Sequence, residues 1–279
     1  MKKISRRSFL AAAGLSVAAL ALTACGGSSA STASSVASSA ASSEAASTSA
    51  AAGELTTVEA GKLTMATNAT FPPYEMTTDA GEFEGIDIET AQAIADKLGL
   101  ELQIDDMDFD AALLSVQQGK ADIVMAGVTV TDERKAVMDF SDSYATGIQS
   151  IIVPEGSDIA SPDDLAGKKI GTQRGTTGYI YCSDDFGDDA VVAYDNGLTA
   201  VQALNNGQVD AVVIDNAPAK EYVAANPGLV ILDTNYAEED YAIGLAKGSS
   251  LEAAVNAALE ELKADGTLQS IVDKYITAE

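Results

Sequence analysis

Two charged side chains in this sequence, Arg134 and Asp215, lie at or shortly after the end of an apolar run, where they could act on a ligand. Arg134 comes shortly after the apolar run that ends at Ala126, and Thr131 is a good N-cap that would place Arg134 in the first turn of a helix. A cation there lies at the positive end of the helix dipole. Its presence favours a carboxylate clamp, with Gly127 and Thr129 beside it. The alternative is an ion pair with a neighbouring acid.

Asp215 ends a second apolar run and is followed by Asn216-Ala217-Pro218. A carboxylate at the end of a strand can receive an ammonium group, or it can cap the helix that follows. Both roles are compatible. The two runs follow similar segments, Gly119-Lys120-Ala121-Asp122 and Gly207-Gln208-Val209-Asp210, so two similar α/β units are expected.

A third candidate segment is the turn Gln173 to Gly178, which contains Thr176 and Thr177. The amides and hydroxyls of such a strand-to-helix turn can accept an anion, although ordinary turn formation explains the residues equally well. The sequence contains no G-x-x-x-x-G-K-[ST] loop and no G-x-G-x-x-G after a strand, so no nucleotide cofactor is expected.

Composition excludes several kinds of chemistry. The 279 residues include no histidine, which rules out imidazole bases, Ser/His/Asp triads and His-ligated zinc. The net charge of -26 would repel phosphate backbones, so nucleic acid is not an expected partner. Asp106 to Asp110 has the alternating acids of a calcium loop but lacks its glycine and terminal glutamate, so no metal is expected.

The first 54 residues have the composition of an export signal and a tether. A basic start and the apolar stretch Phe9 to Leu22 predict a signal peptide over residues 1–24, by a twin-arginine or a general secretory route. Leu22-Thr23-Ala24-Cys25 resembles a lipobox, which predicts lipidation of Cys25. Residues 25–54 are mostly Ser and Ala and predict a flexible tether. Cys182 is expected to be a buried helix residue, with no intramolecular disulfide.

From residue 62, short β-rich runs alternate with helical periods, which favours an α/β fold. A helix is predicted over Ile86 to Leu98 with Gly99 as its C-cap, and two helices near 249–264 and 267–275 close the chain. The predicted strands are Leu63 to Thr67, Leu100 to Ile104, Asp122 to Ala126, Gln149 to Val153, Lys169 to Gln173, Ala190 to Tyr194, Asp210 to Ile214, Leu229 to Leu232 and Tyr241 to Leu245.

Several segments together resemble the extracellular solute-binding proteins of polar amino-acid ABC importers (family 3 solute-binding lipoproteins), over about residues 60–279. The matching segments are Thr67 to Tyr74, Gly85 to Ile88, Ala126 to Arg134, Asp139 to Asp142, Gln173 to Thr177 and Leu262 to Thr267. The resemblance implies two α/β lobes joined by two crossing hinge strands, the periplasmic-binding-protein type II fold, with the ligand in the cleft between the lobes. Lobe 1 would comprise 55–150 with 243–279, and lobe 2 would comprise 151–242. Hinges are expected near Ser150 to Val153 and Tyr241 to Ile243.

The same resemblance implies roles for individual residues. Arg134 would hold the α-carboxylate of an amino acid, helped by the amides of Thr129 and Thr177. Asp215, the Thr129 hydroxyl and the Ala126 carbonyl would receive the α-ammonium, and Gly127 and Thr176 are further expected ligand-binding residues. The ligand side chain would lie among Asn68, Phe71, Phe109 and Gln173. Asn68 is neutral where binders of basic amino acids carry Asp, which puts a lysine or arginine ligand in doubt, although Asp108 or Glu75 could supply a negative charge.

The expected partners are a free amino acid, an ABC permease with its ATPase subunits, and the outer face of a bacterial membrane through a lipid anchor. The protein is expected to be a monomer without cofactor or catalytic residues. Two other functions remain open: a dehydratase of cyclic amino-acid precursors, in which a cleft carboxylate would be a general acid, and a ligand-sensing module.

Overall fold

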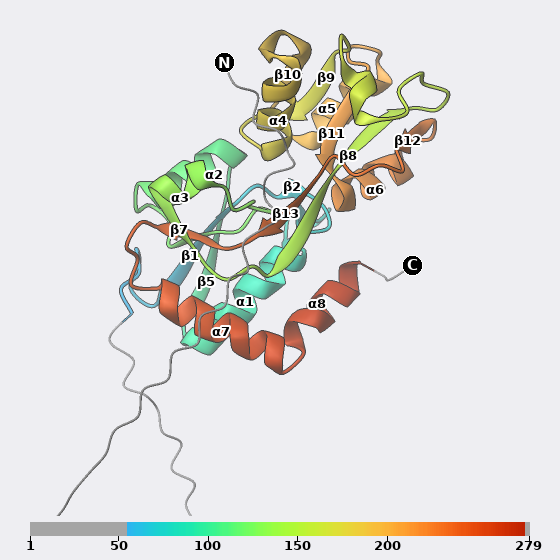
Figure 1. Cartoon of the computed structure of the whole chain (residues 1–279). Helices are drawn as coiled ribbons and strands as arrows, with labels where there is room; N and C mark the ends of the chain where they lie inside the picture. The colour runs from blue at the N-terminus through green and yellow to red at the C-terminus, as the bar shows by residue number, and fades with distance from the viewer. Residues whose placement is uncertain (1–54, 277–279) are drawn as a thin grey trace, which may run out of the picture. The chain divides into compact units, whose positions relative to one another are not determined.

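The computed structural model describes residues 55–276, which lie within one compact unit of the chain, residues 51–279. Two sheets organise this unit, each covered by helices (Figure 1). We call the part built on the five-stranded sheet lobe 1 and the part built on the six-stranded sheet lobe 2. The fold class predicted from the sequence, two α/β lobes, is confirmed. The predicted signal peptide, Cys25 and the tether lie outside the described residues.

The sheet of lobe 1 has the strand order β5-β1-β6-β14-β7. Strand β1 is parallel to β5 and β6, whereas β14 is antiparallel to β6 and β7. The elements of this lobe are β1 (Lys62–Thr67), α1 (Ile86–Leu98), β5 (Glu101–Asp106), α2 (Phe109–Gln117), β6 (Ile123–Val124), α3 (Asp132–Val137), β7 (Met138–Phe140), β14 (Gly244–Ala246), α7 (Glu252–Ala264) and α8 (Thr267–Tyr275).

The sheet of lobe 2 has the order β10-β9-β11-β8-β12, and β13 also pairs with β8. Strands β9, β10 and β11 are parallel, and β8 is antiparallel to its neighbours. The elements are β8 (Ala145–Pro154), η1 (Pro162–Leu165), β9 (Ile170–Gln173), α4 (Thr177–Phe186), η2 (Asp188–Ala190), β10 (Val191–Tyr194), α5 (Gly197–Asn205), β11 (Ala211–Asp215), α6 (Asn216–Ala225), β12 (Leu229–Ile231) and β13 (Ala237–Tyr241).

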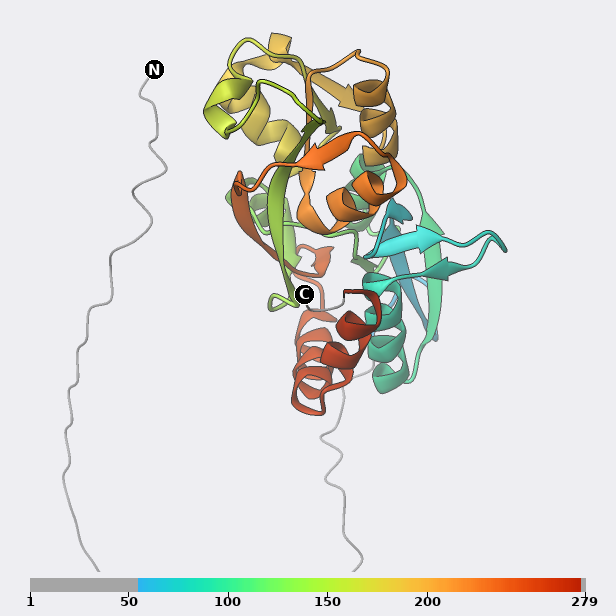
Figure 2. The ribbon, with the colours of Figure 1, turned by 90° about the vertical axis from the view of Figure 1, so that its right-hand side faces the viewer.

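A small third sheet lies beside α1 and carries a buried acid that matters below. It consists of β2 (Thr70–Phe71), β3 (Glu75–Thr77) and β4 (Phe83–Glu84), paired in that order. These are the cyan strands at the right of Figure 2.

The two lobes are joined by a ribbon of two antiparallel strands, β8 and β13. Ala145 to Gln149 in β8 pair with Tyr241 to Ala237 in β13, and the rest of β8 enters the sheet of lobe 2 (Figure 1). Residues 150–153, expected as a hinge, pair with β11 or β12 inside that sheet. The first crossing therefore precedes them, between the end of β7 and the middle of β8.

The predicted continuous strand Tyr241 to Leu245 was wrong. The chain ends β13 at Tyr241 and starts β14 at Gly244, because it leaves one sheet and enters the other within this apolar run. Tyr241 is fully buried at this crossing, and its ring fills the space beside Gly147, where a Cβ would lie 2.4 Å from the tyrosine Cζ.

Helix boundaries largely follow the capping residues recognised in the sequence. Helix α1 has the predicted bounds and ends at Gly99 in the left-handed conformation, with φ of 69°. Thr131 caps α3 through its Oγ1, which accepts a hydrogen bond from the Arg134 amide at 3.2 Å. Cys182 is fully buried in α4, as predicted.

Each lobe has its own apolar core. In lobe 1, Ile94 and Leu259 belong to a cluster that packs α1 and α7 on the sheet, and in lobe 2 Val201 and Val212 belong to a cluster under α5. Within the described residues, the clusters give each lobe a contiguous set of buried apolar side chains.

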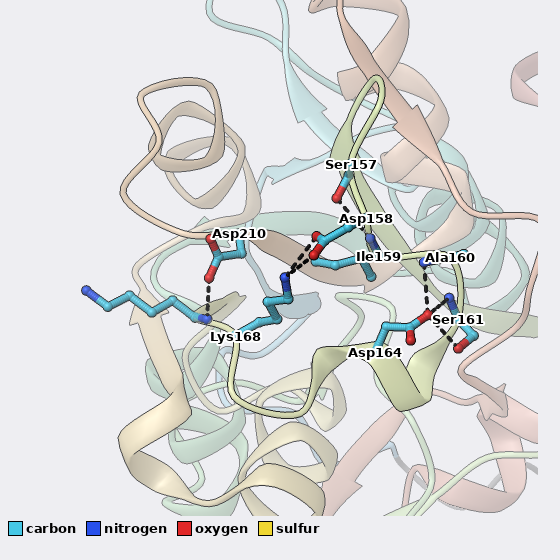
Figure 3. A network of polar contacts seen from close by, with 9 residues as sticks. Ser157, Asp158, Ile159, Ala160, Ser161, Asp164, Lys168 and Asp210 are labelled. Carbon is cyan, nitrogen blue, oxygen red and sulfur yellow. Dashed lines mark hydrogen bonds and ion pairs between the residues drawn. The ribbon is translucent and has the colours of Figure 1, made fainter.

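The loop between β8 and β9 is held by polar contacts at the outer edge of lobe 2 (Figure 3). Ser161 and Asp164 form a capping box at η1, and Lys168 contacts Asp158 at 2.8 Å. The Asp210 carboxylate accepts a hydrogen bond from the Lys169 amide at 2.8 Å, which ties the start of β9 to the start of β11.

Candidate functional site

A buried pocket lies between the two lobes, where the predicted ligand residues come together. Lobe 1 and lobe 2 both contribute to its walls, and the β8–β13 ribbon closes one side. We call it the interlobe pocket. It is lined by Asn68, Phe71, Glu75, Phe109, Ala126, Gly127, Thr129, Arg134, Gln149, Gln173, Thr176, Thr177, Val213, Ile214, Asp215 and Tyr241. Every residue predicted from the sequence to contact the ligand is in this set.

The interlobe pocket is nearly filled by its own side chains. Its cavity volume is about 30 Å³, room for roughly one water molecule. An amino acid cannot enter this space unless the lobes move apart or side chains rearrange. The structure therefore represents a closed arrangement in which groups of the protein bond to one another.

Arg134 is held at the junction of the lobes. Its Nη1 donates to the Thr129 carbonyl at 2.8 Å in lobe 1, and its Nη2 donates to the Gly175 carbonyl at 3.1 Å in lobe 2. The guanidinium also lies over the Phe109 ring, 5.3 Å from the centroid. The side chain is buried, and this burial lowers its pKa, although Glu239 opposes the shift. Among the described residues, these contacts position the side chain rather than the ion pair with a neighbouring acid that was the alternative from the sequence.

A guanidinium has five N–H donors. Two of them are used in the bonds to the carbonyls, so the remaining donors can bind an anion. A carboxylate arriving beside Arg134 would meet a desolvated cation, for which a charge-assisted pair is strong. The site can thus bind a carboxylate at this point.

Asp215 fulfils the capping role predicted for it and also faces the pocket. Its carboxylate accepts hydrogen bonds from the amides of Ala217 at 3.0 Å and Ile148 at 2.7 Å. Burial raises the pKa of Asp215 to about 6, against the opposing effect of these bonds. A buried carboxylate is a favourable site for an ammonium group, because an adjacent cation favours its ionised form.

Asn68 and Gln173 bond across the interlobe pocket. The Gln173 side-chain nitrogen donates to the Asn68 oxygen at 2.9 Å, joining the end of β9 to the end of β1. The Phe71 ring stacks on Tyr74, with centroids 5.8 Å apart. Gly127 allows the backbone to approach this ring, because a Cβ there would lie 2.9 Å from Phe71 and its φ is 55°.

Glu239 is a buried acid beside the pocket that the sequence analysis missed. One carboxylate oxygen accepts hydrogen bonds from Thr129, Thr177 and Gln149, each at 3.0 Å. These residues belong to both lobes and to β8, so Glu239 links the lobes through the ribbon. A signal was present, because in a strand Glu239 must share a face with Tyr241, two residues later.

Other charged residues considered from the sequence lie elsewhere. Arg174 is exposed, and its Nη2 lies 3.9 Å from Asp195. Asp108 precedes α2 at the N-cap position and is not among the pocket residues. Glu75 does line the pocket, as a completely buried side chain.

The described part of the chain offers neither a metal site nor a membrane-spanning helix. Within residues 55–276, no group of three or more His, Cys, Asp or Glu side chains is placed to hold a metal ion. None of the helices in this range combines the length and apolar character that crossing a membrane requires.

Comparison with known proteins gives a consistent result. The profile of "Bacterial extracellular solute-binding proteins, family 3" matches residues 63–278. A relative named "Probable histidine-binding protein" from Neisseria gonorrhoeae is 33% identical over 276 residues, covering 96% of this chain and 95% of the relative. The "L-cystine-binding protein TcyJ" of Escherichia coli is 34% identical, covering 79% and 85%.

The fold has a close counterpart among solved structures. The "arginine-, lysine-, histidine-binding protein ArtJ" from Geobacillus stearothermophilus superposes with a TM-score of 0.75 at 35% identity, covering 78% of this chain and 96% of that one.

Proposed function

The chain belongs to the bacterial extracellular solute-binding proteins, family 3, and on this basis we propose that it captures a free polar L-amino acid in the interlobe pocket for an ABC importer. The relatives named above are amino-acid-binding proteins. The observation that carries the proposal is the position of the buried Arg134 and Asp215 on the walls of one pocket. An amino acid zwitterion has the two charges that would complement them.

The proposed ligand bridges the lobes through its main-chain groups. Its α-carboxylate binds Arg134, with the backbone amides of Thr129 and Thr177 as further donors. Its α-ammonium binds Asp215, the Thr129 hydroxyl and the Ala126 carbonyl. The side chain lies among Asn68, Phe71, Phe109 and Gln173, all of which line the pocket.

Binding is proposed to act by shifting a lobe equilibrium. The pocket has no room for an amino acid as it stands, so the lobes must part to admit one. Closed lobes already bond directly through the side chain of Arg134 to the Gly175 carbonyl and between Gln173 and Asn68. A ligand that contacts both lobes favours closure by its differential affinity for the closed form.

Delivery to a membrane permease is part of the proposal. Cys25 would carry a lipid anchor on the outer face of the cell membrane after removal of residues 1–24, and residues 25–54 would be the tether. The binding unit would then work as a monomer beside the permease and its ATPase subunits.

No enzymatic step is proposed. The relatives and structures described above carry the names of binding proteins. Of the pocket acids, Asp215 accepts hydrogen bonds from the amides of Ile148 and Ala217, which hold its carboxylate in place to receive an ammonium group.

A thermal-shift panel of the twenty amino acids on residues 55–279 tests this function. A ligand at 100 times its dissociation constant stabilises the folded protein by about 2.7 kcal/mol. For a chain of this size each kcal/mol raises the melting temperature by roughly 2–4 °C. We expect a rise of several degrees for at least one polar amino acid. No shift with any amino acid would overturn the proposal.

A further inference from the structure

Glu239 is a buried acid of strand β13, 6% exposed, and it lies behind the wall of the interlobe pocket. It is not among the residues that line the pocket. Its Oε2 atom accepts hydrogen bonds from the Thr129 hydroxyl, the Thr177 hydroxyl and the Gln149 side-chain nitrogen, each at 3.0 Å. All three donor residues do line the pocket. Glu239 is therefore placed to act on a ligand through its neighbours.

The bonds to Glu239 fix the direction of two hydroxyl protons. A hydroxyl has one proton and two lone pairs, whereas an ionised carboxylate can only accept. Because the Thr129 and Thr177 hydroxyls both donate to Glu239, neither has a proton left for the other, although their oxygens lie 3.4 Å apart. The Thr129 oxygen therefore offers a ligand lone pairs and no donor.

Arg134 supplies the counter-charge that keeps Glu239 ionised. Burial lowers the pKa of Arg134, and Glu239 opposes that shift more than any other charge. The two side chains meet at Thr129, whose hydroxyl bonds Glu239 and whose carbonyl accepts a hydrogen bond from Arg134 Nη1 at 2.8 Å. An oxygen that accepts three donors close to a buried cation belongs to an ionised carboxylate.

Only acceptors surround the position proposed for the α-ammonium group. In the proposed mode of binding this group meets the Asp215 carboxylate, the Ala126 carbonyl and the Thr129 hydroxyl, and all three residues line the pocket. An ammonium group has three N–H donors and no acceptor, so it can satisfy all three. A hydroxyl in its place has one donor and would leave two buried acceptors unpaired. Unpaired groups of this kind let a site reject a close analogue.

We infer that Glu239 is a positioning residue that makes the α-ammonium group obligatory in the ligand. It holds the Thr129 proton away from the pocket, so that the Thr129 oxygen can accept a hydrogen bond but cannot donate one. The site then takes α-amino acids and rejects the matching α-hydroxy acids, although both carry the carboxylate that suits Arg134. This inference rests on the proposed amino-acid function and specifies which group of the ligand the site requires.

Calorimetric titration of the purified full-length protein with paired probes tests the inference. Each pair is an amino acid that binds in the panel and the α-hydroxy acid with the same side chain, such as L-arginine with L-argininic acid or L-glutamine with L-α-hydroxyglutaramic acid. Weakly bound hydroxy acids are measured by displacement of the amino acid. The ratio of the two dissociation constants, the discrimination, depends on the α-substituent because the rest of each pair is shared. We expect a discrimination of at least about a hundredfold in the unmodified protein.

Glu239→Met removes the acceptor and keeps the length of the side chain. The freed Thr129 proton can then turn toward the pocket, where it opposes an ammonium group but can donate to the oxygen of an α-hydroxyl. The amino acid should bind roughly 10- to 150-fold more weakly, since one hydrogen bond to a charged group is lost. The hydroxy acid should bind at least as tightly as before, so the discrimination should fall at least about tenfold.

Two variants separate this role from a general loss of packing. Glu239→Gln retains an oxygen that can accept from the Thr129 hydroxyl, so it should keep most of the discrimination that Glu239→Met loses. Glu238→Met changes the neighbouring, exposed residue of β13 and serves as the matched control, with both dissociation constants unchanged. Melting curves without ligand check that each variant is folded.

A double-mutant cycle on the amino acid alone gives an independent measurement. Thr129→Val removes the hydroxyl through which Glu239 acts. Adding Glu239→Met to Thr129→Val should then weaken the amino acid by less than about threefold, whereas two independent sites would multiply their losses.

The outcomes separate the two proposals. An unmodified protein that binds the α-hydroxy acid within about tenfold of the amino acid overturns the inference, and this measurement needs no variant. The inference also fails if Glu239→Met weakens both probes by the same factor or changes neither, or if the losses in the cycle multiply. In each of these cases the amino-acid function stands. Failure of every amino acid in the panel to bind overturns the function itself.

Discussion

Replacing Arg134 by methionine should remove most of the ligand affinity. The side chain is buried, bonds to the Thr129 and Gly175 carbonyls and lies 5.3 Å from the Phe109 ring centroid, so no solvent replaces its charge when it is lost. Truncating one partner of a buried, hydrogen-bonded charge pair costs about 2–5 kcal/mol. At about 1.4 kcal/mol per tenfold, the dissociation constant should rise roughly 30-fold to several thousand-fold.

A lysine at the same position separates the effect of the guanidinium's donor geometry from the effect of its positive charge. Arg134→Lys keeps a cation but cannot donate two parallel bonds to a carboxylate while reaching the Gly175 carbonyl. Losing one hydrogen bond to a charged group costs about 1.5–3 kcal/mol of binding free energy. The lysine variant should therefore bind roughly 10- to 150-fold more weakly than the unmodified protein, and less weakly than Arg134→Met.

Calorimetric titration with the best ligand of the amino-acid panel is the assay. The control is Arg174→Met, which removes an exposed arginine whose side chain is 57% accessible and lies outside the pocket. Melting curves without ligand check that each variant is folded. The reasoning is refuted if Arg134→Met binds within threefold of the unmodified protein, or if Arg174→Met loses as much affinity as it does.

Three further results are expected. Gly147→Ala should lower the melting temperature, because its Cβ would lie 2.4 Å from the buried Tyr241 ring and overpacking costs about 1–3 kcal/mol; an unchanged melting curve would contradict this. Tyr222→Phe removes a 2.7 Å bond to the Thr70 carbonyl across the lobes, worth about 1 kcal/mol, so titration should show about fivefold weaker binding, and equal affinity would oppose it. Burial raises the pKa of Asp215 to about 6, so its stabilising effect is complete below pH about 4 and is lost as pH rises through 6. The melting temperature of the ligand-free protein, measured by calorimetry, should therefore fall between pH 5 and 7.5. A melting temperature that rises over that interval would contradict this prediction.

Local signals in the sequence were enough to place the main pocket residues. Thr131 as an N-cap predicted that Arg134 lies in the first turn of a helix, which is α3. The apolar run before Asp215 predicted that this carboxylate lies at the end of a strand, which is β11. The carboxyl ends of parallel strands gather at one edge of a sheet, which is why residues from both lobes meet. Their contacts with a ligand stay a prediction.

Features that depend on the crossing between lobes could not be predicted in the same way. The apolar run 241–245 looks like one strand, yet it is divided between two sheets, because its pairing partners are distant in the sequence: Tyr241 pairs with Ala145, whereas Gly244 pairs with Val124. The role of Glu239 depends on Thr129 and Thr177 meeting it from different lobes, which no local pattern records. The expected lobe boundaries also stay a prediction.

A crystal structure of the protein with its best amino-acid ligand tests the central claim most directly. We expect the α-carboxylate within hydrogen-bond distance of the Arg134 guanidinium and the α-ammonium within the same distance of the Asp215 carboxylate, with the ligand enclosed by both lobes. A ligand bound outside the interlobe pocket, or one that contacts neither of these two side chains, would contradict the account.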